Sequence, residues 1–251
     1  MDRQIIITGA NNGIGLAMAK ALLELGDRVA ILDLSTENLP ENPSLLAFVC
    51  DVTDPQRVQS VVDKIVQTWG GIDILVNNAC LALFARFENR GLEDIRREFE
   101  VNYFGYLNLI RAVLPSMITK GHGVVHNLSS GVGYTGMPGM TGYTSTKGAI
   151  ESLTRTLALE YAGQGIVFNV VHPPLTRTQS AAGFGVPPEM MADPEVVGRE
   201  LAKLVGKTRP VLVAGFVNGI QLWMSYHFRF QMGKLMSMMA DRARNSKSAA
   251  Q

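Results

Sequence analysis

The sequence predicts an α/β fold, in which a doubly wound parallel sheet of about seven strands carries helices on both faces. Short aliphatic or β-branched runs alternate with longer segments of helical pattern, which is typical of strand–helix–strand units. The short runs are almost continuously apolar, as strands buried on both faces must be. Neither an internal repeat nor a linker divides the 251 residues, so we expect a single domain over residues 1–251.

The strands follow from seven short apolar runs rich in Val, Ile or Leu. In chain order they are Gln4–Thr8, Arg28–Asp33, Leu45–Asp51, Ile72–Asn77, Gly123–Ser129, Ile166–Val171 and a run near Pro210–Val213. Helices are expected between them at Gly13–Leu25, Pro55–Trp69, Leu92–Ile118, Tyr143–Tyr161 and Pro194–Val205. Asp54 before Pro55 marks one start clearly, because aspartate is a favourable N-cap and proline suits the first helical position. Residues 218–244 predict a further long helix, a C-terminal extension of the domain.

The composition excludes several classes of protein. The 23 basic and 22 acidic side chains leave a net charge of +1. Nucleic-acid-binding proteins usually carry a marked basic excess, so we expect no nucleic-acid partner. With 47% hydrophobic and 18% charged residues, the chain can bury a large core.

Cysteine and histidine give no sign of a metal site or of a disulfide framework. Cys50 and Cys80 are the only cysteines, and they and the four histidines are too scattered for ligand spacing. The first apolar run begins at Gln4, which leaves no room for a signal peptide. No apolar stretch reaches the roughly 20 residues needed to span a bilayer. We therefore expect a cytoplasmic protein.

A glycine-rich segment joins the first strand to the first helix and reads Thr8-Gly9-Ala10-Asn11-Asn12-Gly13-Ile14-Gly15. Glycines at such a turn let the backbone approach a pyrophosphate, and the N-terminus of the following helix presents free N–H groups to it. The spacing is G-x-x-x-G-x-G, which differs from the common G-x-G-x-x-G. We expect a dinucleotide to contact Gly9, Asn11, Asn12, Gly13, Ile14 and Gly15.

Asp33 ends the second predicted strand, 18 residues after Gly15. This is close to the roughly 20-residue offset of the acid that binds the adenosine ribose. A carboxylate there repels a 2′-phosphate, and neither Asn12 nor Leu34-Ser35 supplies an arginine or lysine to bind one. The sequence therefore favours NAD(H) over NADP(H), with Asp33 and Leu34 among the cofactor contacts.

Tyr143 and Lys147 stand four residues apart at the start of a predicted helix, so they share one face of it. The pattern Tyr-x-x-x-Lys occurs once among the six tyrosines, after a strand that ends in Ser129-Ser130. A nearby ammonium favours the phenolate form, so this pair suits proton transfer.

Together these motifs resemble those of the classical short-chain dehydrogenase/reductase family. The matching residues occur in the family's order over about residues 4–178, and they are the Thr8–Gly15 turn, Asn77-Asn78-Ala79, Asn102, Ser130, Tyr143 and Lys147. Ser130 precedes Tyr143 by thirteen residues, as in the family, which favours it over Ser129. The resemblance implies a Rossmann-type fold and an oxidoreductase.

The resemblance also implies roles for individual residues. Tyr143 would be the general acid/base and Ser130 would hold the substrate oxygen. Lys147 would lower the pKa of the tyrosine and bind the nicotinamide ribose, and Asn102 would support a proton-relay water. Further cofactor contacts would come from Asp51 and Val52 at the adenine, Asn78 and Ala79 in the cleft, and Thr178 at the nicotinamide carboxamide.

Two positions depart from the family's pattern. Cys80 replaces the glycine of Asn-Asn-Ala-Gly, and a thiol there would narrow the cleft. Pro174 replaces the glycine of the Pro-Gly pair after the sixth strand. Proline fixes φ near −65° and lacks an N–H, so the path of this loop under the nicotinamide is left open. We interpret both as specificity variants.

Residues 179–194 are mostly small or apolar and follow Thr178, so we expect them to form a substrate lid. Phe84, Met137 and Met140 are candidates to join it. Such a lining suits a hydrophobic secondary alcohol or ketone, steroid-like or with an acyl chain, because methionine adapts to irregular shapes.

The C-terminal helix is apolar on two sides. One stripe holds Met224, Phe228, Met232, Leu235 and Met239, and the other holds Trp223, Tyr226 and Phe230. Residues 225–251 carry five basic side chains against one acidic, a net charge of +4. Three roles stay open: packing in the core or between subunits, a wall of the substrate pocket, and contact with a membrane surface, which basic residues beside Met and aromatic side chains favour.

The sequence thus predicts an NAD(H)-dependent enzyme that transfers a hydride between nicotinamide and a hydrophobic alcohol or ketone. One alternative is an NADPH-dependent carbonyl reductase. The other is a nucleotide-binding sensor or scaffold that performs no chemistry. The family resemblance implies a homodimer or homotetramer, which the long helices predicted at Leu92–Ile118 and Tyr143–Tyr161 could support.

Overall fold

Seven parallel strands form one sheet in the computed structural model, which describes residues 2–184 and 186–248 and, for residues 182 and 239–248, the backbone alone. The strands are β1 Gln4–Thr8, β2 Arg28–Asp33, β3 Leu45–Val49, β4 Ile74–Asn77, β5 Gly123–Leu128, β6 Ile166–His172 and β7 Val211–Val213. They are ordered β3-β2-β1-β4-β5-β6-β7. The predicted doubly wound parallel sheet is confirmed, and the strand ends differ from the predicted ones by two residues or fewer.

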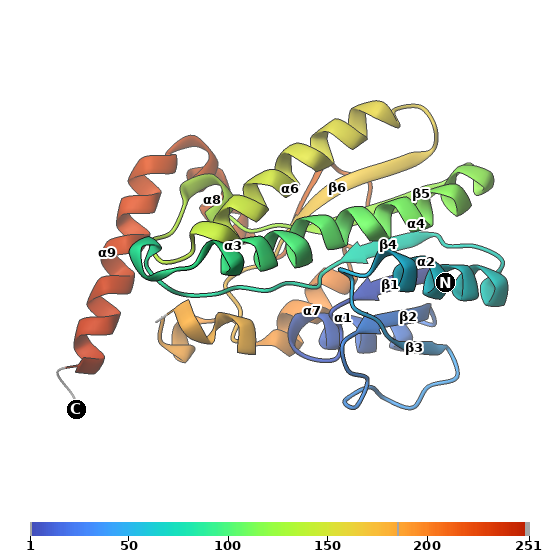
Figure 1. The fold of residues 1–251 in the computed structure, drawn as a ribbon, viewed down its shortest axis with the longest axis horizontal. Coiled ribbons are helices and arrows are strands. Elements are labelled where there is room, and N and C mark those ends of the chain that lie inside the picture. Colours follow the sequence, from blue (N-terminus) through green and yellow to red (C-terminus); the bar gives the residue numbers. More distant parts are fainter. Residues whose placement is uncertain (1, 185, 249–251) are drawn as a thin grey trace.

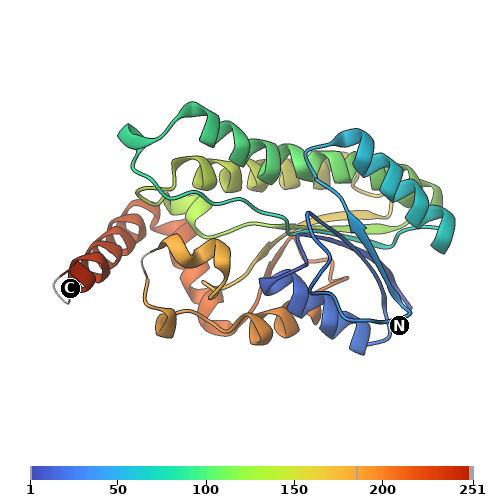
Figure 2. The same ribbon diagram turned by 60° about the horizontal axis from the view of Figure 1, so that its bottom comes forward.

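Helices cover both faces of this sheet (Figures 1 and 2). The helices are α1 Gly13–Glu24, α2 Pro55–Trp69, α3 Leu92–Phe99, α4 Gly105–Lys120, α5 Val132–Thr135, α6 Thr141–Glu160, α7 Pro194–Ala202, α8 Phe216–His227 and α9 Arg229–Ser248. Helices α1 and α7 lie side by side on one face, and α2, α4 and α6 lie on the other. None of the described helices is both long and apolar enough to cross a membrane.

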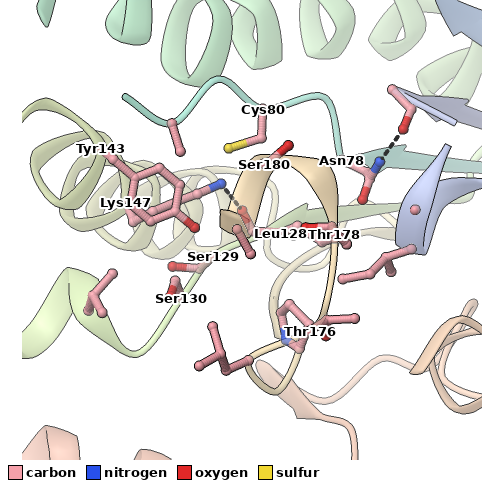
Figure 3. A pocket seen from close by; sticks show the side chains of 18 of the residues that line it. Asn78, Cys80, Leu128, Ser129, Ser130, Tyr143, Lys147, Thr176, Thr178 and Ser180 are labelled. Carbon is pink, nitrogen blue, oxygen red and sulfur yellow. Dashed lines mark hydrogen bonds between the residues drawn. The ribbon is translucent and has the colours of Figure 1, made fainter. Parts of the chain in front are cut away.

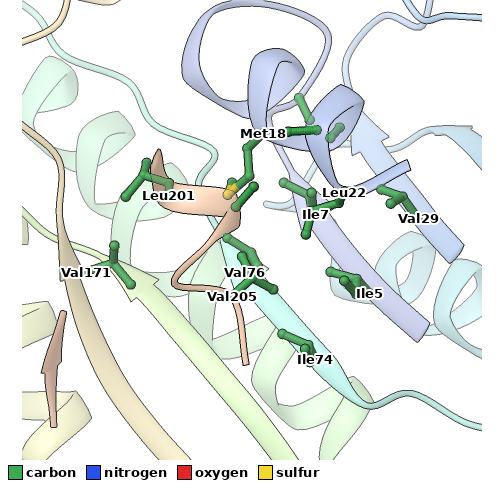
Figure 4. Close-up of a cluster of buried hydrophobic side chains, with 14 of the residues drawn as sticks. Ile5, Ile7, Met18, Leu22, Val29, Ile74, Val76, Val171, Leu201 and Val205 are labelled. Atoms are coloured by element: carbon green, nitrogen blue, oxygen red, sulfur yellow. The ribbon is translucent and has the colours of Figure 1, made fainter. Parts of the chain in front are cut away.

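Two apolar cores result from the alternation of side chains along the buried strands. In β1, Ile5 and Ile7 pack with Met18, Leu22 and other side chains beneath α1 and α7 (Figure 4). Ile6, between them in sequence, points to the opposite core under α2 and α4. Because both faces are covered, every residue of β1 is buried, which explains why the strand sequences are almost uninterruptedly apolar.

The strand order changes direction between β1 and β4. From β1 the chain crosses to β2 and then β3, and it returns to β4 on the other side of β1. Connections that leave in opposite directions open a crevice at the carboxyl ends of these two strands, which is where ligands bind in open α/β sheets. The glycine-rich segment Thr8–Gly15 begins at this point.

Two predicted helices are interrupted. The helix expected over Leu92–Ile118 holds a π-helical segment, Glu100–Phe104, between α3 and α4. The C-terminal helix breaks at Phe228, whose backbone (φ −120°, ψ 49°) is not helical, and so forms α8 and α9. Neither interruption contains proline or a helix-breaking pattern, so periodicity alone could not reveal it.

His126 on β5 is a buried histidine held in its neutral form. Its Nδ1 lies 2.6 Å from Oδ1 of Asn169, and its Nε2 accepts the N–H of Gly206 at 2.8 Å. An amide oxygen can only accept, so Nδ1 carries the proton and Nε2 is free of it. Burial lowers the pKa of His126 from 6.5 to about 4.

This histidine makes stability depend on pH. Between pH 6.5 and about 4 the unfolded chain binds a proton at His126 that the folded chain does not bind. The free energy of unfolding is therefore highest above this pH range and decreases as the pH falls through it. We expect His126 to account for a loss of about 2 kcal/mol in the free energy of unfolding between about pH 7 and about pH 5. Urea denaturation of the wild type and of His126→Gln at both values measures it. The variant should lose less than the wild type on acidification, and equal losses would contradict this account.

Candidate active site

A cavity of about 1190 Å³ opens at the carboxyl edge of the sheet. The residues that follow β1, β2, β3, β4, β5 and β6 all contribute to its wall. It therefore extends across the crevice at the switch between β1 and β4, where the fold leads us to expect a ligand.

The ends of β1 and β4 are packed as closely as backbones can be. A Cβ on Gly9, whose φ is +66°, would lie 2.6 Å from Cα of Ala79. The Thr8 hydroxyl accepts the N–H groups of Asn78 and Ala79, each at 3.0 Å. In return, Nδ2 of Asn78 donates to the carbonyl oxygens of Thr8 and Gly9 at 2.9 and 2.7 Å. These contacts fix the floor of the crevice.

The first turn of α1 faces the cavity without side chains that would block it. A Cβ on Gly15 would meet the Gly9 carbonyl oxygen at 2.5 Å, so only glycine fits there. Gly13 lies under Thr178, whose Cγ2 would be 3.2 Å from a Cβ at that position. Among the described contacts, the side chain of Asn12 makes no capping bond to this helix. The N–H groups of its first turn are thus available to an anion.

Asp33 lies at the end of β2 and also lines the cavity. Its Oδ2 accepts the N–H of Asn11 at 2.8 Å, and its Oδ1 accepts the N–H of Ser35 at 3.4 Å. The Oδ1 of Asn11 accepts in turn from the N–H of Asn38 at 2.9 Å. The glycine-rich turn is therefore tied to the carboxylate, which fixes the position of Asp33 in the cavity.

Most residues singled out from the sequence line this one cavity. They are Gly9, Asn12, Gly13, Ile14, Gly15, Asp33, Leu34, Asp51, Val52, Asn78, Ala79, Ser130, Tyr143, Lys147 and Thr178. Asn11 and Asn102 do not line it: both are buried behind its wall, and both bond to residues that do line it.

Three of the predicted catalytic side chains converge at one end of the cavity (Figure 3). Lys147 is buried, and its Nζ donates to the Leu128 carbonyl oxygen at 2.8 Å. The same Nζ lies 5.5 Å from the centre of the Tyr143 ring. The hydroxyl of Tyr143 points toward Ser130, which hydrogen-bonds to it. Among the described residues, no carboxylate lies within ion-pair distance of Lys147.

Burial raises the pKa of Tyr143 above its ordinary value of 10. The hydrogen bond from Ser130 acts in the opposite direction but is outweighed. The family resemblance implies that Lys147 lowers this pKa, and that role stays a prediction, since burial is the largest cause of the shift here. The pKa is raised because burial disfavours the charged phenolate more strongly than Ser130 stabilises it. Tyr143 therefore keeps its proton near neutral pH.

Asn102 occupies the π-helical segment between α3 and α4 and is fully buried. Its Oδ1 accepts the Leu81 N–H at 2.7 Å, while its Nδ2 donates to the Leu81 carbonyl oxygen at 2.8 Å and to Oγ1 of Thr146 at 3.1 Å. The amide thus joins the strand following β4 to the helix that carries Tyr143 and Lys147. A role toward a relay water stays a prediction.

A buried polar cluster that the sequence did not suggest adjoins the site. Glu151, on the same helix as Tyr143, accepts the Tyr134 hydroxyl at 2.6 Å, and its Oε1 lies 3.0 Å from Nε2 of His172. Burial acts to raise the pKa of Glu151, but His172, Ser129 and Tyr134 lower it below its ordinary value. Ser129 thus acts on the pKa of Glu151 and Ser130 on that of Tyr143, and the choice of Ser130 as the catalytic serine stays a prediction.

Several of the described residues between Thr178 and Ala192 line the cavity, and an isolated bridge between Thr176 and Ala192 joins the two ends of this segment. At its base, the Ala192 N–H donates to Leu175 at 2.8 Å and the Arg177 N–H donates back to Ala192 at 2.9 Å. Within it, Phe184 packs edge-on against Phe84 with ring centres 5.1 Å apart. The segment supplies Ser180, Ala181, Phe184, Val186, Pro187 and Met190 to the wall.

Helices α8 and α9 supply the opposite part of the wall. Their contributions are Asn218, Gln221, Leu222, Ser225, Met232, Leu235 and Met236. Of the three roles left open from the sequence, the structure shows the pocket wall for these residues, and also core packing, since Met236 packs against the cluster of Val132, Met137 and Met140. Met239 and the basic residues from Arg242 onward lie outside the described side chains.

Both departures from the family pattern also face the cavity. Burial raises the pKa of the Cys80 thiol, which points toward Lys147 (Figure 3). Pro173 and Pro174 line the wall where the chain leaves β6, and the Pro174 carbonyl oxygen accepts the Thr176 hydroxyl at 2.7 Å. The loop therefore continues along the cavity wall to Thr178 without the missing glycine. No group of His, Cys, Asp and Glu among the described residues is arranged to hold a metal ion.

Comparison with known proteins agrees with this arrangement. A model of the short chain dehydrogenase family matches residues 3–185, which include the glycine-rich turn, Ser130, Tyr143 and Lys147. The chain belongs to this family. It is therefore an oxidoreductase by family, and its fold is the Rossmann-type fold of that family.

Individual members extend the comparison. The chain is 37% identical over 190 residues to a 2-(R)-hydroxypropyl-CoM dehydrogenase of Xanthobacter autotrophicus, covering 71% of this chain and 76% of the relative. A crystal structure of a 3-ketoacyl-(acyl-carrier-protein) reductase from Brucella melitensis, complexed with NADH, has a TM-score of 0.75 at 25% identity and covers 84% and 96% of the two chains. An NAD+-bound xylitol dehydrogenase gives 0.74 at 29% identity, with 85% and 98% covered.

The close packing at Gly9 generates a prediction about stability. We expect Gly9→Ala to lower the free energy of unfolding by about 3 kcal/mol or more, because it adds a backbone collision to the cost of a positive φ. Gly70→Ala is the matched control: φ is +81° there, but nothing lies within 4 Å of the added Cβ. It should cost only about 1 kcal/mol. Equal losses for the two variants in urea denaturation would contradict the packing argument.

Proposed function

We propose that this chain is an NAD(H)-dependent dehydrogenase or reductase acting on hydrophobic secondary alcohols and ketones. One observation carries the proposal: a single cavity joins the glycine-rich turn and Asp33 to Ser130, Tyr143 and Lys147, and then to an apolar wall. A cofactor and a small substrate thus have room to meet beside the half-buried Tyr143 phenol and the buried Lys147 ammonium.

The residues present fit a dinucleotide. The turn has no Cβ where a pyrophosphate must approach, and the first N–H groups of α1 face the cavity. Asp33 would bind the adenosine ribose. Asp51 and Val52 would contact the adenine. Thr178 and Lys147 would contact the nicotinamide end of the cofactor. Two similar structures hold this cofactor, one as NADH and one as NAD+.

Asp33 supports NAD(H) rather than NADP(H). Its carboxylate accepts two backbone N–H groups, which hold it in the cavity as a fixed negative charge. A 2′-phosphate beside it would be repelled. The cations that line the described part of the cavity are Lys147 and Arg97, and neither belongs to the loop that follows β2.

The chain's own residues supply the proton chemistry. When bound, the nicotinamide gives or accepts a hydride at C4. In ketone reduction, the Tyr143 phenol donates its proton to the substrate oxygen, and its raised pKa keeps that proton available. Ser130 donates a hydrogen bond to the same oxygen. Lys147 places a positive charge beside the phenol, which stabilises the phenolate left behind.

In alcohol oxidation Tyr143 must accept a proton, so its phenolate must be stabilised. The Ser130 hydroxyl already lowers the pKa of the phenol, although burial dominates. We infer that oxidation is favoured by alkaline pH and reduction by neutral pH. Asn102 is a positioning residue in this account, since it acts by holding Leu81 against the helix of Tyr143.

The shape of the wall supports an apolar substrate. Met137, Phe184, Leu222, Met232 and Met236 all line the cavity, and three of them, Met137, Phe184 and Met236, pack in one cluster with Tyr143. Methionine and aromatic side chains suit an irregular hydrocarbon surface. We propose that residues 179–194 act as a lid over it and that the whole chain works as one domain.

Oligomer formation is part of the same proposal. Exposed apolar side chains include Phe104, at the end of the π-helical segment before α4, and Leu159 on α6. Burying such side chains against a second copy would give the homodimer or homotetramer that the family resemblance implies.

The central catalytic prediction concerns Tyr143→Phe. Removing the phenol oxygen should lower kcat/KM about a hundredfold or more for an accepted alcohol or ketone, because no other acid is placed at the substrate oxygen. NADH binding, measured by fluorescence, should persist. Tyr161→Phe, at the far end of the same helix, is the matched control and should keep full activity. Undiminished turnover in Tyr143→Phe would remove the phenol from the mechanism.

A further inference from the structure

Helices α8 and α9 have an outer face that the proposed reaction does not use. Their inner side chains line the cavity, but the outer ones lie open to solvent. We name this exposed set the α8–α9 patch, and it consists of Phe216, Val217, Ile220, Trp223, Tyr226, Phe228, Phe230 and Met238. Phe216 and Phe230 are each 84% exposed, more than any other aromatic side chain described.

The patch carries cations and no acid. From residue 201 to residue 240 the sequence holds no aspartate or glutamate. Within the two helices, Arg229 and Lys234 are exposed, and the guanidinium of Arg229 lies 5.0 Å from the centre of the Tyr226 ring. Aromatic rings with basic side chains among them, on a stretch of helix whose sequence holds no acid before Asp241, are typical of segments that lie in a membrane interface.

The position of the patch agrees with such a contact. Figures 1 and 2 show α9 projecting from the body of the molecule, away from the layers that cover the sheet. Leu235 both lines the cavity and is 44% exposed, so it lies at the rim where cavity and patch meet. A surface that covered the patch would therefore lie beside the entrance to the apolar pocket.

A second copy of the chain fits the patch less well. In a two-fold contact the patch would face a second copy of itself, so Arg229 and Lys234 would face a surface that carries cations and offers no acid to pair with. An anionic surface satisfies those charges and buries the aromatic side chains at the same time.

We propose that the α8–α9 patch binds the surface of a membrane that contains anionic lipid. The aromatic side chains enter the interfacial layer, and Arg229 and Lys234 contact the headgroups. The cavity entrance then faces the lipid, from which a hydrophobic substrate can enter without crossing water. The contact itself does not depend on the proposed reaction, because it is measured without substrate or cofactor.

The test is sedimentation of the full chain with two kinds of vesicle at low salt, one of phosphatidylcholine alone and one with equal parts of phosphatidylglycerol. We expect binding to the anionic vesicles that weakens as salt is added. Phe216→Gln combined with Phe230→Gln should weaken it about tenfold or more. Because both side chains are so exposed, the double variant should keep the wild-type thermal unfolding temperature.

Matched control variants test whether vesicle binding requires the α8–α9 patch or only exposed apolar side chains in general. Phe87→Gln combined with Val196→Gln removes two exposed apolar side chains elsewhere and should leave vesicle binding unchanged. Arg229→Gln combined with Lys234→Gln should reduce the preference for anionic over neutral vesicles.

Three results would overturn the proposal. One is a wild type that stays in the supernatant with anionic vesicles at low salt, and another is equal binding by the wild type and the Phe216/Phe230 double variant. The third is a fall in oligomer size of the double variant, measured by light scattering, since this would assign the patch to contact between copies.

Discussion

The contact between the carboxyl ends of β1 and β4 is the constraint on which the rest of this molecule depends. Thr8, Gly9, Asn78 and Ala79 are joined by four hydrogen bonds, and Gly9 has no room for a Cβ. Because the two strands are held this closely, the crossovers that leave them in opposite directions open a crevice directly above the contact. The N-terminus of α1, Asp33 and the catalytic residues all face that crevice. The cavity is therefore a consequence of the sheet order and of one close approach between backbones.

The catalytic end shows how burial and charge compete. Tyr143 is half-buried in the cavity wall, and this burial raises the pKa of its phenol even though Ser130 lowers it and Lys147 lies nearby. Lys147 is itself held by a backbone carbonyl and not by a carboxylate. The ammonium is therefore not neutralised by a salt bridge and stays available to a phenolate and to a ribose hydroxyl. Glu151, the buried acid on the same helix, contacts Tyr134 and His172 and not Lys147.

Much of the fold and of the candidate site could be predicted from the sequence, because the signals for both depend on residues that are close together in the chain. Buried strands must be apolar throughout, a glycine-rich turn needs its glycines, and Tyr143 and Lys147 share a helix face whatever surrounds them. What could not be predicted depends on contacts between distant segments. The π-helical segment is stabilised by bonds of Asn102 to Leu81 and Thr146, and Glu151 meets His172 across the site. The raised pKa of Tyr143 likewise follows from burial, which only the packed structure reveals.

One measurement of hydride transfer tests the proposed cofactor and the proposed substrate class together. Secondary alcohols of increasing hydrocarbon size, deuterated at the carbinol carbon, would be incubated with the protein and NAD+ or NADP+, and the reduced cofactor analysed by mass spectrometry. The account predicts that deuterium enters NADH, faster for the larger apolar alcohols and faster than it enters NADPH. Faster labelling of NADPH, or no labelling of either cofactor across the series, would contradict it.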